Sequence, residues 1–240
     1  GVRIVIDSGL ARLPLYEPAT GLTRLQTVRA SRASAEQRAG RAGRTEPGIA
    51  IRLWRAEQTA SLPAFTPPEI TQADLSGLML DCAAFGVADP AKLSFLDPPP
   101  AAALSEARTL LHDLDAIDST GRLTVTGQAM RKLSLPVRLA HMVAQSGNSK
   151  KAAELAVLLT ERGLGGISAD LDRRLQRFAA ERGPRAQNAR ALAQNLARQA
   201  GNKNNDAPST GALLLLAYPD RVAKARGEHG RFVLANGRGA

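Results

Sequence analysis

Residues 34–44 read SAEQRAGRAGR, and they lie between two strand-like segments, 2–7 (VRIVID) and 49–54 (IAIRLW). The first segment is a run of mostly β-branched residues that ends in Asp-Ser-Gly, which is typical of a buried strand in an α/β sheet. Ser34 followed by Gln37 fits a capping box, so the stretch predicts a helix that begins at Ser34. Strand, helix and strand in this order predict an α/β domain.

The predicted helix carries a row of polar and cationic side chains. At about 100° per residue, Gln37, Arg41 and Arg44 fall within about 60° of one another on one face. Arg38 points away from this face, and we assign it a structural role. Two glycines inside a helix cost roughly 1 kcal/mol each relative to alanine, so we expect them to pack closely against another backbone. A row of guanidinium groups suits a polyphosphate whose charge grows during a reaction, and a solvated arginine face is the alternative.

The rest of residues 1–58 does not complete a domain. Segments 13–16 and 22–28 predict a hairpin that closes at the Pro-Ala-Thr-Gly turn of residues 18–21. Two sheet strands, one hairpin and one helix leave sheet edges unpaired. We therefore predict that residues 1–58 are the closing part of an α/β domain.

From Pro67 onward the pattern becomes mainly helical. Residues 117–126 (IDSTGRLTVT) interrupt it and predict a hairpin around Ser-Thr-Gly, and helices followed by a small hairpin are typical of a winged helix. Further helical patterns follow in four segments, 131–146, 150–161, 170–181 and 185–200. Residues 201–210 (GNKNNDAPST) predict a polar linker before the last 30 residues.

Charge favours a polyanionic partner. The 240 residues include 32 Lys and Arg against 22 Asp and Glu, which gives a net charge of +10, and only six of the bases are lysine. Such an excess favours nucleic acid as the partner, although a codon bias toward arginine is an alternative source of the arginine content. Aromatic residues make up only 3% of the chain, which argues against recognition of bases by aromatic stacking.

Several classes of site and location are excluded or disfavoured. Cys82 is the single cysteine, so an intramolecular disulfide and a Cys-rich zinc site are excluded, and its place on an apolar stripe predicts a core thiol. His112, His141 and His229 lack the spacing of metal ligands, so we expect no metal site. No stretch is long and apolar enough to cross a bilayer and no secretory signal opens the chain, so we expect a cytoplasmic location and no membrane partner.

The arginine motif and three further segments resemble those of a known protein family. QRAGRAGR at residues 37–44 resembles motif VI of superfamily 2 helicases in its DEAH-box form, and residues 5–44 resemble the run from the end of motif V into motif VI. LSFLDPPP at 93–100 and LTVTGQAMRKLSLPVRLAHM at 123–142 resemble the winged helix and the start of the helical bundle. Residues 217–240 resemble the bacterial HrpB-type group in particular.

The resemblance implies a multi-domain chain, in which a part of an α/β RecA-like domain precedes a mainly α winged helix and helical bundle. Its expected parts are the C-terminal part of the second RecA-like domain (1–58), the winged-helix domain (67–135), the helical-bundle or ratchet domain (136–200), and a linker with the start of the HrpB-type C-terminal region (201–240). The sequence contains neither a G-x-x-x-x-G-K-[ST] phosphate loop nor a DEAH tetrapeptide. The resemblance therefore implies a fragment of a larger enzyme.

The resemblance also implies roles for the motif residues. The larger enzyme would be an ATP-dependent RNA or DNA helicase, in which Arg41 and Arg44 are arginine fingers that reach the γ-phosphate. Gln37 would contribute to ATP binding by ordering the attacking water. ATP and Mg²⁺ would be held mainly by the absent first RecA-like domain, which is then a partner of this chain, together with single-stranded RNA or DNA. The resemblance assigns no individual residue to nucleic-acid contact, and the fragment alone is predicted to be inactive.

Two other classes of function stay open. One is a non-enzymatic winged-helix module that binds nucleic acid, and the other is a scaffold whose basic charge is background. A winged-helix module that acts as a regulator needs a polar recognition helix before its wing. The helical segment at this place, residues 101–116 (AAALSEARTLLHDLDA), is largely apolar and acidic, which suits packing between domains better.

Overall fold

The two strand-like segments around the arginine motif form a parallel pair. They are β1 (Ile4–Asp7) and β4 (Ile49–Arg52), with Ile4 opposite Ile49 and Asp7 opposite Arg52. A computed structural model of the chain describes residues 1–17, 22–147, 149–201, 208–227, 230–235, 237 and 239. The chain divides into a first unit, Gly1–Leu75 with Ala91–Ala107, and a second unit, Ser76–Pro90 with Arg108–Ala240.

The parallel pair is more exposed than its sequence predicts. A run of β-branched residues predicts a buried strand, yet Ile6 and Ile49 expose 66% and 60% of their surface. Helix α1 (Arg32–Ala39) contacts β1, but the sheet has only two strands among the described residues. Apolar side chains that α1 does not cover therefore face outward.

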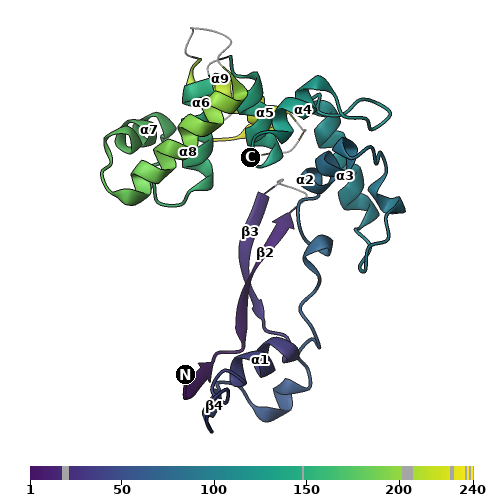
Figure 1. The fold of residues 1–240 in the computed structure, drawn as a ribbon, viewed down its shortest axis with the longest axis vertical. Helices are drawn as coiled ribbons and strands as arrows, with labels where there is room; N and C mark the ends of the chain where they lie inside the picture. The colour runs from purple at the N-terminus through teal and green to yellow at the C-terminus, as the bar shows by residue number, and fades with distance from the viewer. Residues whose placement is uncertain are drawn as a thin grey trace. The chain divides into compact units, whose positions relative to one another are not determined.

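A long hairpin follows β1 in the first unit. Strands β2 (Leu10–Glu17) and β3 (Leu22–Arg29) pair antiparallel over their full length, with Leu10 opposite Arg29 and Glu17 opposite Leu22 (Figure 1). The predicted hairpin is confirmed, and both strands are longer than the sequence pattern indicated. The predicted turn at residues 18–21 lies outside the described residues.

Helix α1 begins earlier than predicted. Its N-cap is Ser31, whose hydroxyl accepts a hydrogen bond from the Ser34 amide at 3.1 Å. The predicted start at Ser34 with a capping box to Gln37 is therefore wrong. Two serines three residues apart both fit a cap, and the extended backbone at Ser31 (φ −73°, ψ 160°) decides between them.

The second unit is mainly helical, as the periodicity predicts (Figure 1). Helix α3 (Ala101–Asp113) runs from the first unit into the second. The other elements of the second unit are α2 (Ser76–Ala84), α4 (Val125–Arg131), α5 (Val137–Gln145), α6 (Ser149–Thr160), α7 (Leu171–Ala180), α8 (Pro184–Ala200), α9 (Thr210–Ala217), β5 (Ala223–Ala225) and β6 (Phe232–Leu234). Helix α6 packs against α8, and α5 packs against α9. Four fully buried side chains mark this core, Met142, Val143, Leu155 and Leu158.

Two predicted elements of the second unit differ from the structure. The hairpin expected at 117–126 is reduced to a single bridge between Ile117 and Leu123, because the Thr124 hydroxyl caps α4 and the following residues are helical. The helix expected at 131–146 is broken before α5, where Pro136 occupies the N-cap. Most of the predicted linker, residues 202–207, lies outside the described residues.

Candidate functional site

The arginine motif is not one continuous helix. Helix α1 ends at Ala39, and Gly40 is its C-cap. The amides of Arg41 and Ala42 then donate to the carbonyl oxygens three residues earlier, at 3.1 and 3.0 Å, which closes a tight turn. Residues 40–44, here called the motif turn, therefore lie beyond the helix. The predicted shared helical face is wrong, because a helix with two glycines at this end stops at the first.

The three predicted site residues are all exposed. Gln37 lies on the last part of α1, whereas Arg41 and Arg44 lie in the motif turn. Within the described part of the chain, the side chains of Arg41 and Arg44 form no ion pair or hydrogen bond. Their guanidinium groups therefore keep all their donors for an anionic ligand.

Close packing occurs after the motif, not at the glycines inside it. A Cβ atom at Gly40 would meet only carbonyl oxygens of its own helix, at 3.4 and 3.7 Å, and one at Gly43 would meet no described atom within 4 Å. A Cβ atom at Gly48 would lie 1.9 Å from the carbonyl oxygen of Ala42. Ala42 itself is buried, and Gly48, the residue before β4, packs directly against the motif turn.

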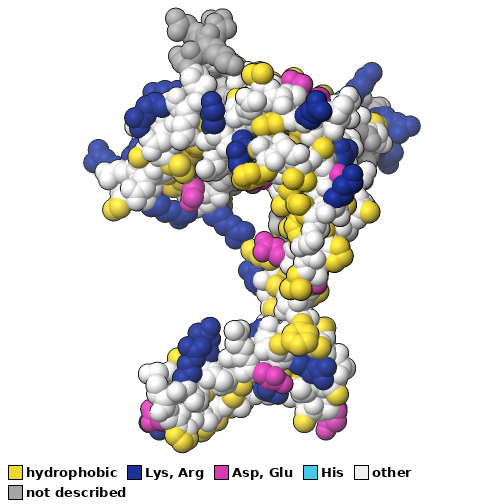
Figure 2. Space-filling view, turned by 45° about the vertical axis from the view of Figure 1, so that its right-hand side comes forward, with side chains coloured by type: hydrophobic (Ala, Val, Ile, Leu, Met, Phe, Trp, Pro, Cys, Tyr) yellow, Lys and Arg dark blue, Asp and Glu magenta, His cyan; other side chains and the backbone are white. Residues whose placement is uncertain are grey.

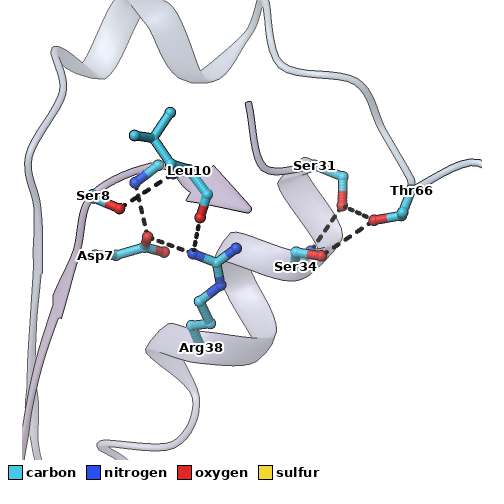
Figure 3. A network of polar contacts seen from close by, with 8 residues as sticks. Asp7, Ser8, Leu10, Ser31, Ser34, Arg38 and Thr66 are labelled. Atoms are coloured by element: carbon cyan, nitrogen blue, oxygen red, sulfur yellow. Dashed lines mark hydrogen bonds and ion pairs between the residues drawn. The ribbon is translucent and has the colours of Figure 1, made fainter. Parts of the chain in front are cut away.

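A partly buried ion pair holds the end of α1 that leads into the motif turn (Figure 3). The Arg38 Nη1 atom donates to Asp7 Oδ1 at 2.8 Å and to the Leu10 carbonyl oxygen at 3.1 Å. The Gly9 amide also donates to Asp7 Oδ1, at 2.9 Å. Arg38 thus has the structural role that its direction on the helix predicted. Its partner was missed, although an Asp at the end of a strand offered a signal.

A second contact holds the start of α1. The hydroxyl groups of Ser31 and Ser34 both lie within hydrogen-bond distance of the Thr66 hydroxyl, at 3.3 and 3.4 Å (Figure 3). The amides of Arg32 and Ala33 donate to carbonyl oxygens of the segment just before Thr66. Helix α1 is therefore anchored at both ends before the motif turn begins.

Other candidate residues have structural surroundings. Cys82 is buried in α2, and burial together with the Asp81 carboxylate raises the pKa of its thiol, so it is a poor nucleophile at neutral pH. The His141 Nδ1 atom lies 2.8 Å from the Leu216 carbonyl oxygen, to which it donates. Among the described residues, no three His, Cys, Asp or Glu side chains gather as metal ligands, and no helix is long and apolar enough to cross a membrane.

Basic side chains form separate groups on the face drawn in Figure 2, with apolar and neutral surface between them. Many arginines of the second unit are engaged with backbone carbonyl oxygens or carboxylates. Examples are Arg108, Arg131, Arg138 and Arg190. The net charge therefore overstates the number of cations that are free to bind nucleic acid.

Comparison with known proteins gives a consistent result. No protein-family model matches the chain. The chain is 41% identical over 245 aligned residues to the Escherichia coli (strain K12) protein named ATP-dependent RNA helicase HrpB, which covers 100% of this chain and 29% of that protein. It is 39% identical over 143 residues to the Homo sapiens protein named Probable ATP-dependent RNA helicase DHX34, which covers 60% of this chain and 12% of that protein.

Solved structures agree with the sequence comparison. A crystal structure of the E. coli DExH-box NTPase HrpB matches 100% of this chain and 29% of its own, with a TM-score of 0.80 and 40% identity. A second, of the E. coli DEAH/RHA helicase HrpB, has a TM-score of 0.83 at 40% identity. The resemblance to HrpB-type helicases is confirmed over the whole chain. The chain spans less than a third of the length of these relatives.

Proposed function

We propose that this chain, which is similar along its whole length to HrpB-type helicases, supplies the arginine fingers of an ATP-dependent RNA helicase. Hydrolysis of ATP would drive movement along a single strand of RNA, or of DNA. The relatives' names support an RNA substrate. The nucleotide itself would be bound mainly by a first RecA-like domain, which is a proposed partner of this chain.

The observation that carries the proposal is the state of two arginines. Arg41 and Arg44 are exposed and unengaged among the described residues, in a turn whose position is restrained by Gly48 behind it and by Arg38 before it. A guanidinium that is free of partners and carried on a restrained backbone can bind the oxygens of a transferring phosphoryl group as charge develops on them. Gln37, exposed on the same segment, would order the attacking water.

The side chains of Gln37, Arg41 and Arg44 suit a nucleotide phosphate and not the metal ion bound to it. Guanidinium and amide groups bind phosphate oxygens, whereas Mg²⁺ prefers carboxylates, water and phosphates. The Asp7 carboxylate nearby is buried against Arg38. We therefore assign Mg²⁺, which supplies charge neutralisation at the phosphates, to the proposed partner domain.

The same proposal assigns the parts of the chain. Residues 1–58 would belong to the second RecA-like domain, and the exposed apolar side chains of β1 and β4 suit strands that continue a larger sheet. Residues 67–135 would form the winged helix, 136–200 the ratchet bundle, and 201–240 the start of the HrpB-type region.

The proposal is tested by phosphate release with and without single-stranded RNA. The longer protein that contains this chain should hydrolyse ATP and be stimulated by RNA, whereas the 240-residue chain alone should not, because its sequence has no phosphate loop. RNA binding by the chain should weaken steeply with salt, with a log–log slope of about −0.7 per neutralised phosphate. If the longer protein binds RNA in a salt-sensitive way but does not hydrolyse ATP, the result would instead favour the non-enzymatic winged-helix module. If it does not bind RNA at all, the result would favour the scaffold.

A further inference from the structure

The guanidinium group of Arg38 lies where three segments of the first unit meet. Its Nη1 atom bridges the Asp7 carboxylate, at the end of β1, and the carbonyl oxygen of Leu10, the first residue of β2. Gly9, between them, donates its amide to the same carboxylate oxygen. One side chain from α1 therefore holds the β1–β2 connection closed, as Figure 3 shows.

This contact is energetically different from a surface ion pair. The Asp7 side chain is only 4% exposed and that of Arg38 is 32% exposed, at an N–O distance of 2.8 Å. The second carboxylate oxygen, Oδ2, is buried and has no hydrogen-bond partner among the described residues. The negative charge of Asp7 therefore depends on Arg38 and on the Gly9 amide, and a buried carboxylate that loses its cation is strongly disfavoured.

The ion pair also lies directly before the motif turn. The carbonyl oxygen of Arg38 accepts the Arg41 amide at 3.1 Å, so the residue that binds Asp7 also closes the first bond of the turn. At the other end of the turn, Gly48 packs against the backbone of Ala42, where a Cβ atom would lie 1.9 Å from the Ala42 carbonyl oxygen. The backbone that carries Arg41 is thus fixed at both ends, and Arg38 is the fixed point on the helix side.

We propose that Arg38 and Asp7 are positioning residues for nucleotide hydrolysis. They do not touch the nucleotide. They hold the end of α1 in one place on β1, so that Arg41 and Arg44 meet the developing charge without reorganising first. This inference rests on the proposed function, because it concerns how the same arginine fingers are placed.

The test is steady-state ATP hydrolysis by the full-length protein with saturating single-stranded RNA, well below its melting temperature. The variants are Arg38→Ala, Asp7→Ala, their double variant, and Arg32→Ala as a control. Arg32 lies on the first turn of the same helix and is exposed. Arg38→Ala should lower kcat about 10–100-fold and leave KM for ATP nearly unchanged, since displacement of a reacting group by about 1 Å can cost about 100-fold.

The double variant distinguishes positioning from general destabilisation. If one contact places the turn, Asp7→Ala combined with Arg38→Ala should lower kcat no further than the worse single variant. Arg32→Ala should resemble the unmodified protein. The inference is overturned if Arg38→Ala also resembles it, or if the effects of the two single variants multiply.

Two conservative variants cover the case in which Arg38→Ala does not fold. Asp7→Asn keeps an acceptor for Gly9 and Arg38 but loses the charge. Arg38→Lys keeps the charge, but its side chain is one bond shorter, so Nζ does not reach the position of Nη1, which makes both hydrogen bonds. Each should lower kcat about 3–10-fold at an unchanged melting temperature. Normal kcat in both would overturn the inference. Arg41→Ala, measured in parallel, separates the two hypotheses: if it leaves kcat unchanged, the proposed function has failed instead.

Discussion

The arginines of the motif turn and those of the second unit differ in burial and in the partners that their side chains bind. Arg41 and Arg44 are exposed, without an ion pair or hydrogen bond in the described chain. Arg138, in α5, has a side chain only 16% exposed and binds both carboxylate oxygens of Asp220, at 2.6 and 3.2 Å. Arg190, in α8, donates to two carbonyl oxygens at the end of α7. The former are free for a ligand, and the latter are part of the fold.

This difference changes how the composition is interpreted. An arginine at the C-terminal end of a helix satisfies carbonyl oxygens and offsets the helix dipole, so it stabilises without binding any partner. Net charge counts such residues together with free ones. Substitutions separate the two groups, because loss of Arg41 or Arg44 should change turnover, whereas loss of an engaged arginine of the second unit should change stability.

The largest effect is expected at the motif turn. Arg41→Ala or Arg44→Ala in the full-length protein should lower turnover by about 10³–10⁵, or roughly 4–7 kcal/mol of barrier, with a much smaller loss of nucleotide affinity. Lys at either position should not rescue turnover, because a point charge lacks the planar fork. The measurements are RNA-stimulated hydrolysis and binding of a non-hydrolysable ATP analogue.

Two outcomes would contradict these roles of Arg41 and Arg44. Near-normal turnover in both alanine variants, together with complete loss in Arg38→Ala, would mean that the roles of the two kinds of arginine are exchanged. A large fall in melting temperature of Arg41→Ala would also contradict the comparison, since an exposed and unengaged side chain contributes little to stability.

The next effect concerns the backbone behind the motif turn. Gly48→Ala would place a Cβ atom 1.9 Å from the Ala42 carbonyl oxygen, so the turn or the strand must shift. We expect turnover to fall about 10–100-fold and stability to fall by about 1–3 kcal/mol. Gly43→Ala is the matched control for stability, because its Cβ atom would meet no described atom within 4 Å. Equal melting temperatures for the two variants would contradict this assignment.

Part of this arrangement follows from the sequence, and part does not. The positions of β1, β4 and the β2–β3 hairpin followed from short strand-like runs, and most helices of the second unit followed from apolar periodicity, because both patterns record local backbone conformation. The exposure of Ile6 and Ile49 did not follow from the sequence pattern. The motif was recognisable in the sequence, but its backbone conformation was not. Gly40 ends the helix, whereas the spacing of Gln37, Arg41 and Arg44 suggested that the helix continues. The Asp7–Arg38 pair joins residues 31 positions apart, which no local pattern encodes.

A smaller effect is expected where an arginine is engaged. Arg138→Ala removes a bidentate ion pair with Asp220, a hydrogen bond to the Ala217 carbonyl oxygen and a contact with the Tyr218 ring at 5.5 Å. We expect a loss of about 2–3 kcal/mol in the free energy of unfolding, measured by chemical denaturation of the 240-residue chain. A loss below about 0.5 kcal/mol would show that burial of this arginine does not secure α9 on α5.

The smallest effect is expected at Arg131, which has the same kinds of partner as Arg138 in a more exposed place. Its Nε atom lies 3.2 Å from Asp81 and its guanidinium 5.1 Å from the centre of the Phe85 ring, but the two charged side chains are 42% and 62% exposed. Water screens both interactions, and ordering two long side chains opposes them. Arg131→Ala should therefore lower the free energy of unfolding by no more than about 1 kcal/mol in the same denaturation experiment, and added salt should shrink that difference. A loss equal to that of Arg138→Ala would mean that partner chemistry, and not burial, sets what an arginine contributes in this unit.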